Sequence, residues 1–197
     1  MEVYLLVLFA YLLGSVPTGY ILGSVAGVDV RKAGSGNVGA TNVARVVGKR
    51  YGILTLVADI AKGFVPVIVA LNIGLTSTAT PFVGIAAFLG HLYPVFLRFQ
   101  GGKGVATALG VFLGLAPWAT LILMAIFVLV LLATRVVSLS SMVAAGCAPI
   151  VFWLFFQSPI LVGMSLFIAL MIVLRHRGNI QRLLSGTEPR LGTSSSR

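Results

Sequence analysis

The chain has 197 residues, of which 58% are hydrophobic and 9% are charged, and its formal net charge is +10. Because a soluble domain usually carries about 25% charged residues, this composition excludes an ordinary water-soluble fold and indicates that lipid surrounds most of the surface. The excess of positive charge fits cytoplasmic loops or attraction to anionic lipids and substrates, and nothing in the chain resembles a nucleic-acid-binding module.

Long apolar stretches predict an all-α integral membrane fold, a compact bundle of seven transmembrane helices. The stretches are residues 3–28, 51–97, 104–134 and 136–174. The first stretch is one span, and the second and fourth are long enough for two helices each. The third breaks near Pro117 into two segments slightly below the usual minimum of about 17 residues. Two crossings are still favoured there, because a single one would put the basic clusters on opposite faces.

Lysines and arginines fall into four polar segments, with Lys62 as the exception. The segments are Arg31–Arg50, Arg98–Lys103, Arg135 alone and Arg175–Arg197, and the intervening turns at 72–81, 115–118 and 157–159 carry no Lys or Arg. Because cytoplasmic loops collect these residues, we predict that the N-terminus is outside and the C-terminus is cytoplasmic. We expect a single polytopic domain over residues 1–197, with a frayed cytoplasmic tail at 185–197.

Small residues recur at every fourth position in two predicted helices. The series are Ser15, Gly19, Gly23 and Gly27 in the first, and Gly102, Ala106, Gly110 and Gly114 in the fourth. Such series let a neighbouring backbone approach closely, so they predict tight helix packing and not a wide pore.

The first polar segment reads Ser35-Gly-Asn-Val-Gly-Ala-Thr-Asn42, preceded by Gly34 and followed by Arg45. Glycines in such a run permit the positive φ angles that turn backbone N–H groups toward an anion. Side-chain donors come from Ser35, Asn37, Thr41 and Asn42, and Arg45 adds charge. The alternative is a flexible, merely solvated loop.

The second polar segment ends in Gly101-Gly102-Lys103-Gly104. It differs from the nucleotide-binding P-loop, because Gly104 stands where that motif needs Ser or Thr. A glycine-rich turn that leads into a helix start can still bind phosphate through free N–H groups, with Lys103 as a nearby charge. The alternative for Lys103 is a purely topological signal at the interface.

The remaining polar residues suggest supporting roles. Ser138, Ser140 and Ser141 follow Arg135 and could cap the next helix. Asp59 and Lys62 are three residues apart on one predicted helix and can pair, either structurally or functionally. His91 is expected to be a hydrogen-bonding core residue. Cys147 is the only cysteine. No metal or cofactor site is visible.

Three of these segments resemble the signature motifs of a known family. Ser35–Asn42 with Arg45, Gly101–Gly104, and Arg175-His-Arg-Gly-Asn179 look like the motifs of the bacterial acyl-phosphate-dependent glycerol-3-phosphate acyltransferases, the PlsY family. The resemblance extends over nearly the whole chain, including its length and motif order. It implies an enzyme of the bacterial inner membrane whose site faces the cytoplasm.

The resemblance implies a reaction and its residues. A fatty acyl group would move from acyl phosphate to the 1-hydroxyl of sn-glycerol 3-phosphate, giving lysophosphatidic acid and inorganic phosphate in the first acylation of phospholipid biosynthesis. Glycerol 3-phosphate would be held by Ser35, Arg45, Lys103, His176 and Asn179. Acyl phosphate would be held by Gly101, Gly102, Lys103, Gly104, Ser138 and Ser141. Asn37, Thr41, Asn42, Asp59, Lys62 and Glu188 would support them.

Catalytic roles would belong to Lys103, His176 and Ser35, without a cofactor. The general base stays open between His176 and a phosphate oxygen of the substrate. Other expected partners are membrane lipids, and docking of an acyl-phosphate-producing enzyme stays open. The alternative functions are a transporter for a phosphorylated solute, which usually has a midplane site reached from both faces, and a non-catalytic lipid-binding scaffold.

Overall fold

The computed structural model describes residues 2–192, and this part of the chain forms helices without strands. It divides into two compact units, the first ending at Ala116 and the second beginning at Pro117. The sequence predicts a single domain over residues 1–197, and this stays a prediction.

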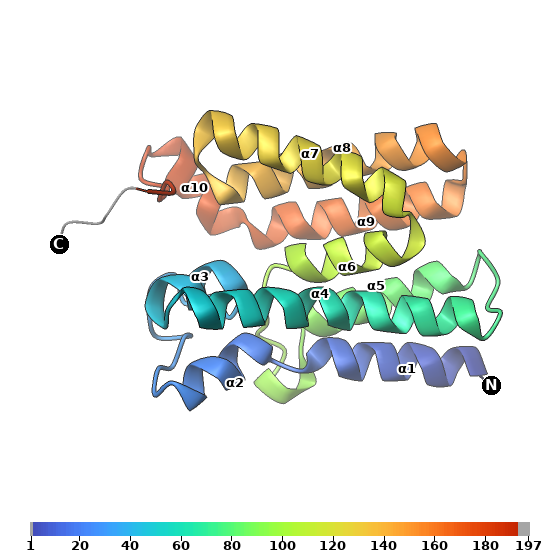
Figure 1. Ribbon diagram of the computed structural model, residues 1–197, viewed down its shortest axis with the longest axis horizontal. Coiled ribbons are helices and arrows are strands. Elements are labelled where there is room, and N and C mark those ends of the chain that lie inside the picture. Colours follow the sequence, from blue (N-terminus) through green and yellow to red (C-terminus); the bar gives the residue numbers. More distant parts are fainter. Residues whose placement is uncertain (1, 193–197) are drawn as a thin grey trace. The chain divides into compact units, whose positions relative to one another are not determined.

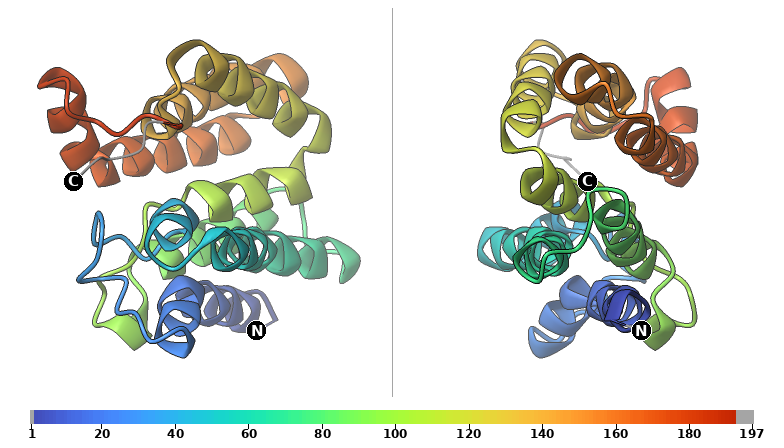
Figure 2. Two further views of the ribbon diagram at one scale, coloured as in Figure 1. Left: turned by 60° about the vertical axis from the view of Figure 1, so that its left-hand side comes forward. Right: turned by 90° about the vertical axis from the view of Figure 1, so that its right-hand side faces the viewer.

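The first unit contains six α-helices and a short 3-10 helix. They are α1 (Glu2–Ser15), α2 (Thr18–Val25), α3 (Ala40–Val46), α4 (Lys49–Asn72), α5 (Thr80–Leu92), η1 (Val95–Leu97) and α6 (Val105–Leu115). The helices α1, α4, α5 and α6 lie side by side, while α2 and α3 gather toward one end (Figures 1 and 2). The residues between α2 and α3, 26–39, are called the first loop below, and Gly101–Gly104 are called the glycine turn.

Glycines set the closest helix contacts of the first unit. Gly63 of α4 lies against the carbonyl of Thr107, and Gly110 of α6 lies against the carbonyl of Ile60, with no room for a Cβ at either glycine. This confirms the close packing predicted from the second small-residue series. In the first series, by contrast, Gly19 meets the carbonyl of Val38, so that its groove holds the first loop.

The described residues of the second unit, 117–192, form four helices. They are α7 (Pro117–Thr134), α8 (Val137–Phe156), α9 (Pro159–Arg175) and α10 (Arg177–Leu184). The first three lie side by side, and α10 bends away from α9 by 59° (Figure 1). After α10, Leu191 N donates to the Arg135 carbonyl at 2.8 Å, and the frayed tail at 185–197 stays a prediction. Residues 193–197 of the predicted tail lie outside the described residues.

Within residues 2–192, five helical segments are long and apolar enough to cross a membrane, and the bent pair of α9 and α10 would make a sixth. The helix α6 has 11 residues, which span only about 16 Å of a hydrocarbon core about 30 Å thick. The count of seven crossings and the orientation of the termini therefore stay predictions. The predicted turns are confirmed, since they fall between α4 and α5, α6 and α7, and α8 and α9.

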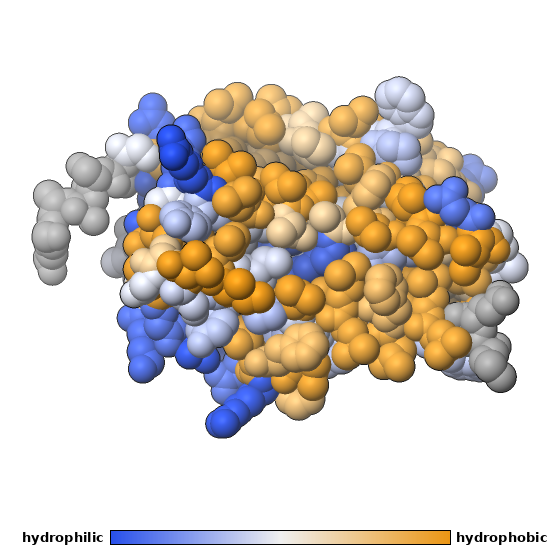
Figure 3. All heavy atoms as spheres, turned by 60° about the horizontal axis from the view of Figure 1, so that its bottom comes forward, coloured by the Kyte–Doolittle hydropathy of each residue, from blue (hydrophilic) through white to orange (hydrophobic). Residues whose placement is uncertain are grey.

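Large apolar side chains are exposed on both units. Leu132 is 73% exposed, Val25 is 74% exposed and Leu154 is 71% exposed. Apolar side chains also dominate the face drawn in Figure 3. Exposure of so many apolar side chains to water is unfavourable, whereas lipid tails solvate them well. The surface is therefore suited to a bilayer.

The first predicted span is not one continuous helix, because α1 ends at Ser15 and α2 begins at Thr18. Pro17 lies in the break and has no N–H to continue a helical ladder. A break inside an apolar span exposes backbone carbonyls that must find donors within the protein. One such donor is Lys62, whose Nζ binds the Val16 carbonyl in this break.

Candidate active site

The first loop is organised by the buried side chain of Asn42. Its Oδ1 accepts from Ser35 N at 2.8 Å. Its Nδ2 donates to the carbonyls of Val30 and Ala33 at 3.1 Å and of Asn37 at 2.9 Å. Two amide hydrogens are thus shared among three carbonyls. Asn42 is 2% exposed, so it shapes the loop from inside and is not a surface donor for an anion.

The loop leaves other polar groups at the surface. Ser35, Thr41 and Arg45 are exposed. Gly34 and Gly36 have φ angles of 58° and 71°, as predicted, and these values keep the turn tight. The side chain of Ser35 is therefore presented by a loop whose own backbone is fixed, although the amide of Ser35 is already bonded to Asn42. Thr41 and Arg45 follow on α3.

The glycine turn folds back on the end of α5. Gly101 N donates to the Leu92 carbonyl and Gly102 N to the His91 carbonyl, both at 3.1 Å. These two amides are therefore bonded within the protein. Gly104 has a φ of 83° and immediately precedes α6, whose first N–H groups have no acceptor within the helix. The amides of this turn that could still receive an anion are therefore those at the start of α6, next to Lys103.

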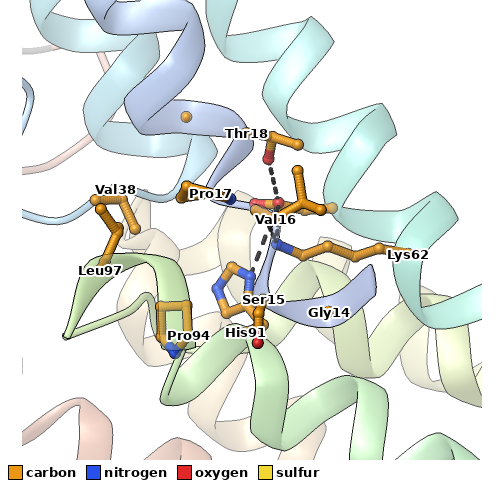
Figure 4. A pocket seen from close by; sticks show the side chains of 12 residues that line it. Gly14, Ser15, Val16, Pro17, Thr18, Val38, Lys62, His91, Pro94 and Leu97 are labelled. Atoms are coloured by element: carbon orange, nitrogen blue, oxygen red, sulfur yellow. Dashed lines mark hydrogen bonds and ion pairs between the residues drawn. The ribbon is translucent and has the colours of Figure 1, made fainter. Parts of the chain in front are cut away.

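A buried charged cluster lies at the break between α1 and α2. Lys62 Nζ is 2.9 Å from Asp59 Oδ1 and donates to the Val16 carbonyl at 3.1 Å. Thr18 Oγ1 donates to the same carboxylate oxygen at 2.6 Å, and His91 Nδ1 lies 3.8 Å from it. The predicted ion pair is confirmed. Figure 4 shows Lys62, Thr18 and His91 converging from different elements.

This cluster borders a small cavity of about 10 Å³, which is room for roughly one water molecule. Val38 of the first loop and Leu97 of η1 also line it (Figure 4). Leu97 packs in addition against the core of Val30, Val38 and Val43. The first loop and the segment that leads into the glycine turn are therefore in contact.

In the second unit, Glu188 gathers the polar side chains. It accepts from Ser138 Oγ at 2.6 Å and Asn179 Nδ2 at 2.5 Å, and Arg182 Nε donates to its other oxygen at 2.7 Å. Burial alone would raise the pKa of Glu188, but the hydrogen bonds from Ser138, Asn179 and Arg182 together lower it below its ordinary value. Glu188 is therefore ionised near neutral pH and fixes the position of Asn179.

His176 lies at the bend between α9 and α10 and is 2% exposed. Its Nδ1 contacts the Ile172 carbonyl at 2.8 Å. Because a carbonyl oxygen only accepts hydrogen bonds, Nδ1 carries a proton, and in the neutral ring Nε2 is the basic nitrogen. This tautomer is the one that a general base at Nε2 would need.

The serines at the start of α8 do not cap it. The N-cap is Val136, without a side-chain cap bond. Ser140 and Ser141 instead donate to the carbonyls of Val136 and Val137 at 2.8 and 2.9 Å. Since Ser138 donates to Glu188, binding of an anion by Ser138 or Ser141 would require its hydroxyl to turn away from its present acceptor.

The family described as glycerol-3-phosphate acyltransferase matches residues 4–186. This chain belongs to that family. The glycerol-3-phosphate acyltransferase of Geotalea daltonii is 52% identical over 183 residues, which cover 93% of this chain and 94% of the relative. That of Geobacter sulfurreducens is 51% identical over 181 residues, which cover 92% and 93%.

Solved structures agree with this assignment. The crystal structure of PlsY, an integral membrane glycerol 3-phosphate acyltransferase, in its glycerol 3-phosphate form has a TM-score of 0.94 and 44% identity, covering 98% of this chain and 97% of that one. Its lysophosphatidic acid form has a TM-score of 0.91 and 43% identity, with the same coverage. With its apolar helices, this member of the glycerol-3-phosphate acyltransferase family is a multi-pass membrane protein.

The predicted site residues of this acyltransferase family member are divided between the units. Ser35, Arg45 and Lys103 belong to the first unit, with the supporting residues Asn37, Asn42, Asp59 and Lys62. His176, Asn179 and Glu188 belong to the second, where Glu188 joins Asn179 to Ser138.

Sequence reasoning missed two residues. Thr18 binds Asp59, and Arg182 binds Glu188. Pro17 indicates a possible helix break. Thr18 is the polar residue directly after it, so the proline was a signal that could have identified Thr18. Arg182 carried no comparable signal, because it is one of many basic residues near the C-terminus.

Proposed function

We propose that this protein transfers a fatty acyl group from acyl phosphate to the 1-hydroxyl of sn-glycerol 3-phosphate. The products are lysophosphatidic acid and inorganic phosphate, and the step is the first acylation of phospholipid biosynthesis. The observation that carries the proposal is the likeness to PlsY, at 44% identity over almost the whole chain, in a form named for glycerol 3-phosphate.

The chemistry of the two substrates suits the polar groups described above. The 1-hydroxyl oxygen attacks the acyl carbonyl carbon, a new ester C–O bond forms, and the bond between that carbon and the phosphate oxygen breaks. Phosphate leaves with the electron pair. Because acyl phosphate is a mixed anhydride and already activated, alignment alone supplies much of the rate; effective molarities correspond to as much as roughly 7–11 kcal/mol.

In the first unit, we assign Ser35 and Arg45 to the phosphate of glycerol 3-phosphate. Arg45 offers a planar guanidinium that can bind phosphate oxygens in pairs, and Ser35 is a hydroxyl donor on a fixed loop. Acyl phosphate is assigned to the glycine turn, where Lys103 and the N–H groups that begin α6 stabilise the charge that develops on the carbonyl oxygen and leaving phosphate.

In the second unit, His176 and Asn179 are assigned to glycerol 3-phosphate, with Glu188 holding Asn179. Ser138 and Ser141 are secondary candidates for acyl phosphate. The Asn179 amide suits a glycerol hydroxyl because it can both donate and accept hydrogen bonds. We propose that the reaction takes place on the cytoplasmic side of the bacterial inner membrane.

The hydroxyl proton goes either to His176 Nε2 or to a phosphate oxygen of the substrate, and we favour the phosphate oxygen. A His176→Gln variant separates these routes. If the phosphate accepts the proton, activity stays within about tenfold of the parent and the pH profile of kcat/KM keeps its shape. Loss of the profile's limb near the histidine pKa would assign the proton to His176 instead.

The direct test uses purified protein in lipid vesicles with glycerol 3-phosphate and palmitoyl phosphate. We expect equal amounts of phosphate and lysophosphatidic acid, and no product from acyl-CoA or acyl carrier protein. Arg45→Gln should raise the KM for glycerol 3-phosphate, whereas the matched variant Arg50→Gln, on the exposed start of α4, should not. Absence of product together with uptake of glycerol 3-phosphate would reverse the assignment in favour of a transporter.

A further inference from the structure

The buried ion pair of α4 requires an explanation beyond packing. Asp59 is 2% exposed and Lys62 is 5% exposed, and both belong to a segment that is apolar enough to cross a membrane. Transfer of two charges out of water has a desolvation cost that their attraction offsets only with good geometry, and apolar residues often stabilise such a site equally well. Ionisable residues in such spans commonly serve function.

On the side of α2, the ion pair binds the residues that support the first loop. Thr18 Oγ1 donates to Asp59 Oδ1 at 2.6 Å, and Lys62 Nζ donates to the Val16 carbonyl at 3.1 Å. These bonds fix the place where α2 begins. The next residue, Gly19, lies so close to the carbonyl of Val38 that a Cβ would not fit. The position of α2 therefore determines where the first loop lies.

On the side of α5, the same carboxylate oxygen lies near His91, the residue that supports the glycine turn. His91 Nδ1 lies 3.8 Å from Asp59 Oδ1. The opposite edge of the His91 ring lies against Gly102, where no Cβ would fit. Gly102 N also donates to the His91 carbonyl at 3.1 Å. A shift of Asp59 would thus be transmitted through His91 to the residue just before Lys103.

We infer that Asp59, held by Lys62, is a positioning residue that fixes the first loop and the glycine turn relative to each other. The inference rests on the proposed function, in which these segments bind the two phosphate substrates. Neither Asp59 nor Lys62 needs to touch a substrate. Their role is to align the glycerol hydroxyl with the acyl carbonyl through the two segments that hold them.

This role has a distinct kinetic signature. Each loop would keep its own binding groups after a small displacement, so the KM values should change little. Alignment of the reacting atoms would suffer, and a misplacement of about 1 Å can lower the rate by roughly a hundredfold. The expected result is a lower kcat with nearly unchanged KM values for both substrates.

The test centres on Thr18, because Asp59→Asn leaves the Lys62 charge unpaired and can prevent folding. Thr18→Val keeps the shape of the side chain and removes the donor to Asp59, whereas Thr18→Ser retains it. Thr80→Val is the matched control: Thr80 is buried, donates to the Thr76 carbonyl at 3.0 Å, and lies at the far end of α5 from His91, about 16 Å along the helix.

We expect Thr18→Val to lower kcat by roughly tenfold to a hundredfold with both KM values within about threefold of the parent. Thr18→Ser and Thr80→Val should keep the parent kcat, even where thermal unfolding shows that Thr80→Val is destabilised. A Thr18→Val enzyme with the parent kcat, or an equal fall in kcat for Thr80→Val, overturns the inference. A parent protein without acyl transfer overturns the proposed function instead.

Discussion

Two polar side chains organise the candidate site, and they do so with different chemistry. Asn42 in the first unit is a neutral amide on α3 that bonds four backbone groups of the first loop. Glu188 in the second unit is a carboxylate that accepts from three side chains on two helices. The first arrangement shapes a backbone, and the second arrangement orients side chains. They should therefore respond differently to substitution and to pH.

The largest expected effect is that of Asn42→Asp. The substitution keeps the acceptor for Ser35 N but replaces the donor to three carbonyls with a second oxygen, which they would repel. Loss of bonds in a buried site with unsatisfied partners costs about 1–3 kcal/mol per group. We expect a clear fall in the unfolding temperature in detergent and at least a hundredfold loss of kcat/KM for glycerol 3-phosphate, roughly 2.7 kcal/mol.

Asn37→Asp is the matched control for that experiment. Asn37 uses its Oδ1 to accept from Gly39 N at 2.7 Å, and an aspartate provides the same acceptor. The same change of residue type, five residues before Asn42, should therefore leave the unfolding temperature close to that of the parent. Similar losses of stability in both variants would show that added negative charge, and not the bonding of Asn42, is responsible.

Glu188→Gln should have a smaller effect that is mainly kinetic. The substituted amide keeps one oxygen as an acceptor, so it can retain either Asn179 or Arg182 but loses the charge that favours both. We expect kcat/KM for glycerol 3-phosphate to fall by about tenfold to thirtyfold, corresponding to roughly 1.4–2 kcal/mol. An Arg190→Gln variant is the control near the same tail. Full activity of Glu188→Gln would show that Asn179 does not depend on this carboxylate.

The sequence predicts much of this arrangement, and the reasons for the remainder are physical. Apolar lengths and basic segments locate the turns, and the spacing of Asp59 and Lys62 predicts their pairing. From the sequence, Pro17 is compatible either with a kinked continuous helix or with a helix end, and only the structure distinguishes the two. The roles of Asn42 and Glu188 depend on partners that are brought together by folding, such as Ser138, which lies fifty residues before Glu188.

The smallest expected effect is on stability as a function of pH, and it separates the two side chains most directly. The pKa of Glu188 in the folded protein lies below its ordinary value of 4.5. A depressed carboxyl pKa contributes stability that is fully present above the unfolded value and is lost as the pH falls through the folded value. The difference in unfolding temperature between the parent and Glu188→Gln should therefore be constant near neutral pH and shrink below about pH 4.5.

This difference isolates Glu188 because the other acidic residues, Glu2, Asp29 and Asp59, are shared by both proteins. Asp29, for example, has its pKa lowered to about 2, first by its hydrogen bond from the Arg31 side chain, and it would titrate identically in each. Asn42 has no ionisable group, so the difference in unfolding temperature between the parent and Asn42→Ala should show no such change with pH. If the difference in unfolding temperature between the parent and Glu188→Gln stays constant down to pH 3, then Ser138, Asn179 and Arg182 do not favour the ionised carboxylate. Asn42 and Glu188 would then differ only in the geometry of their hydrogen bonds.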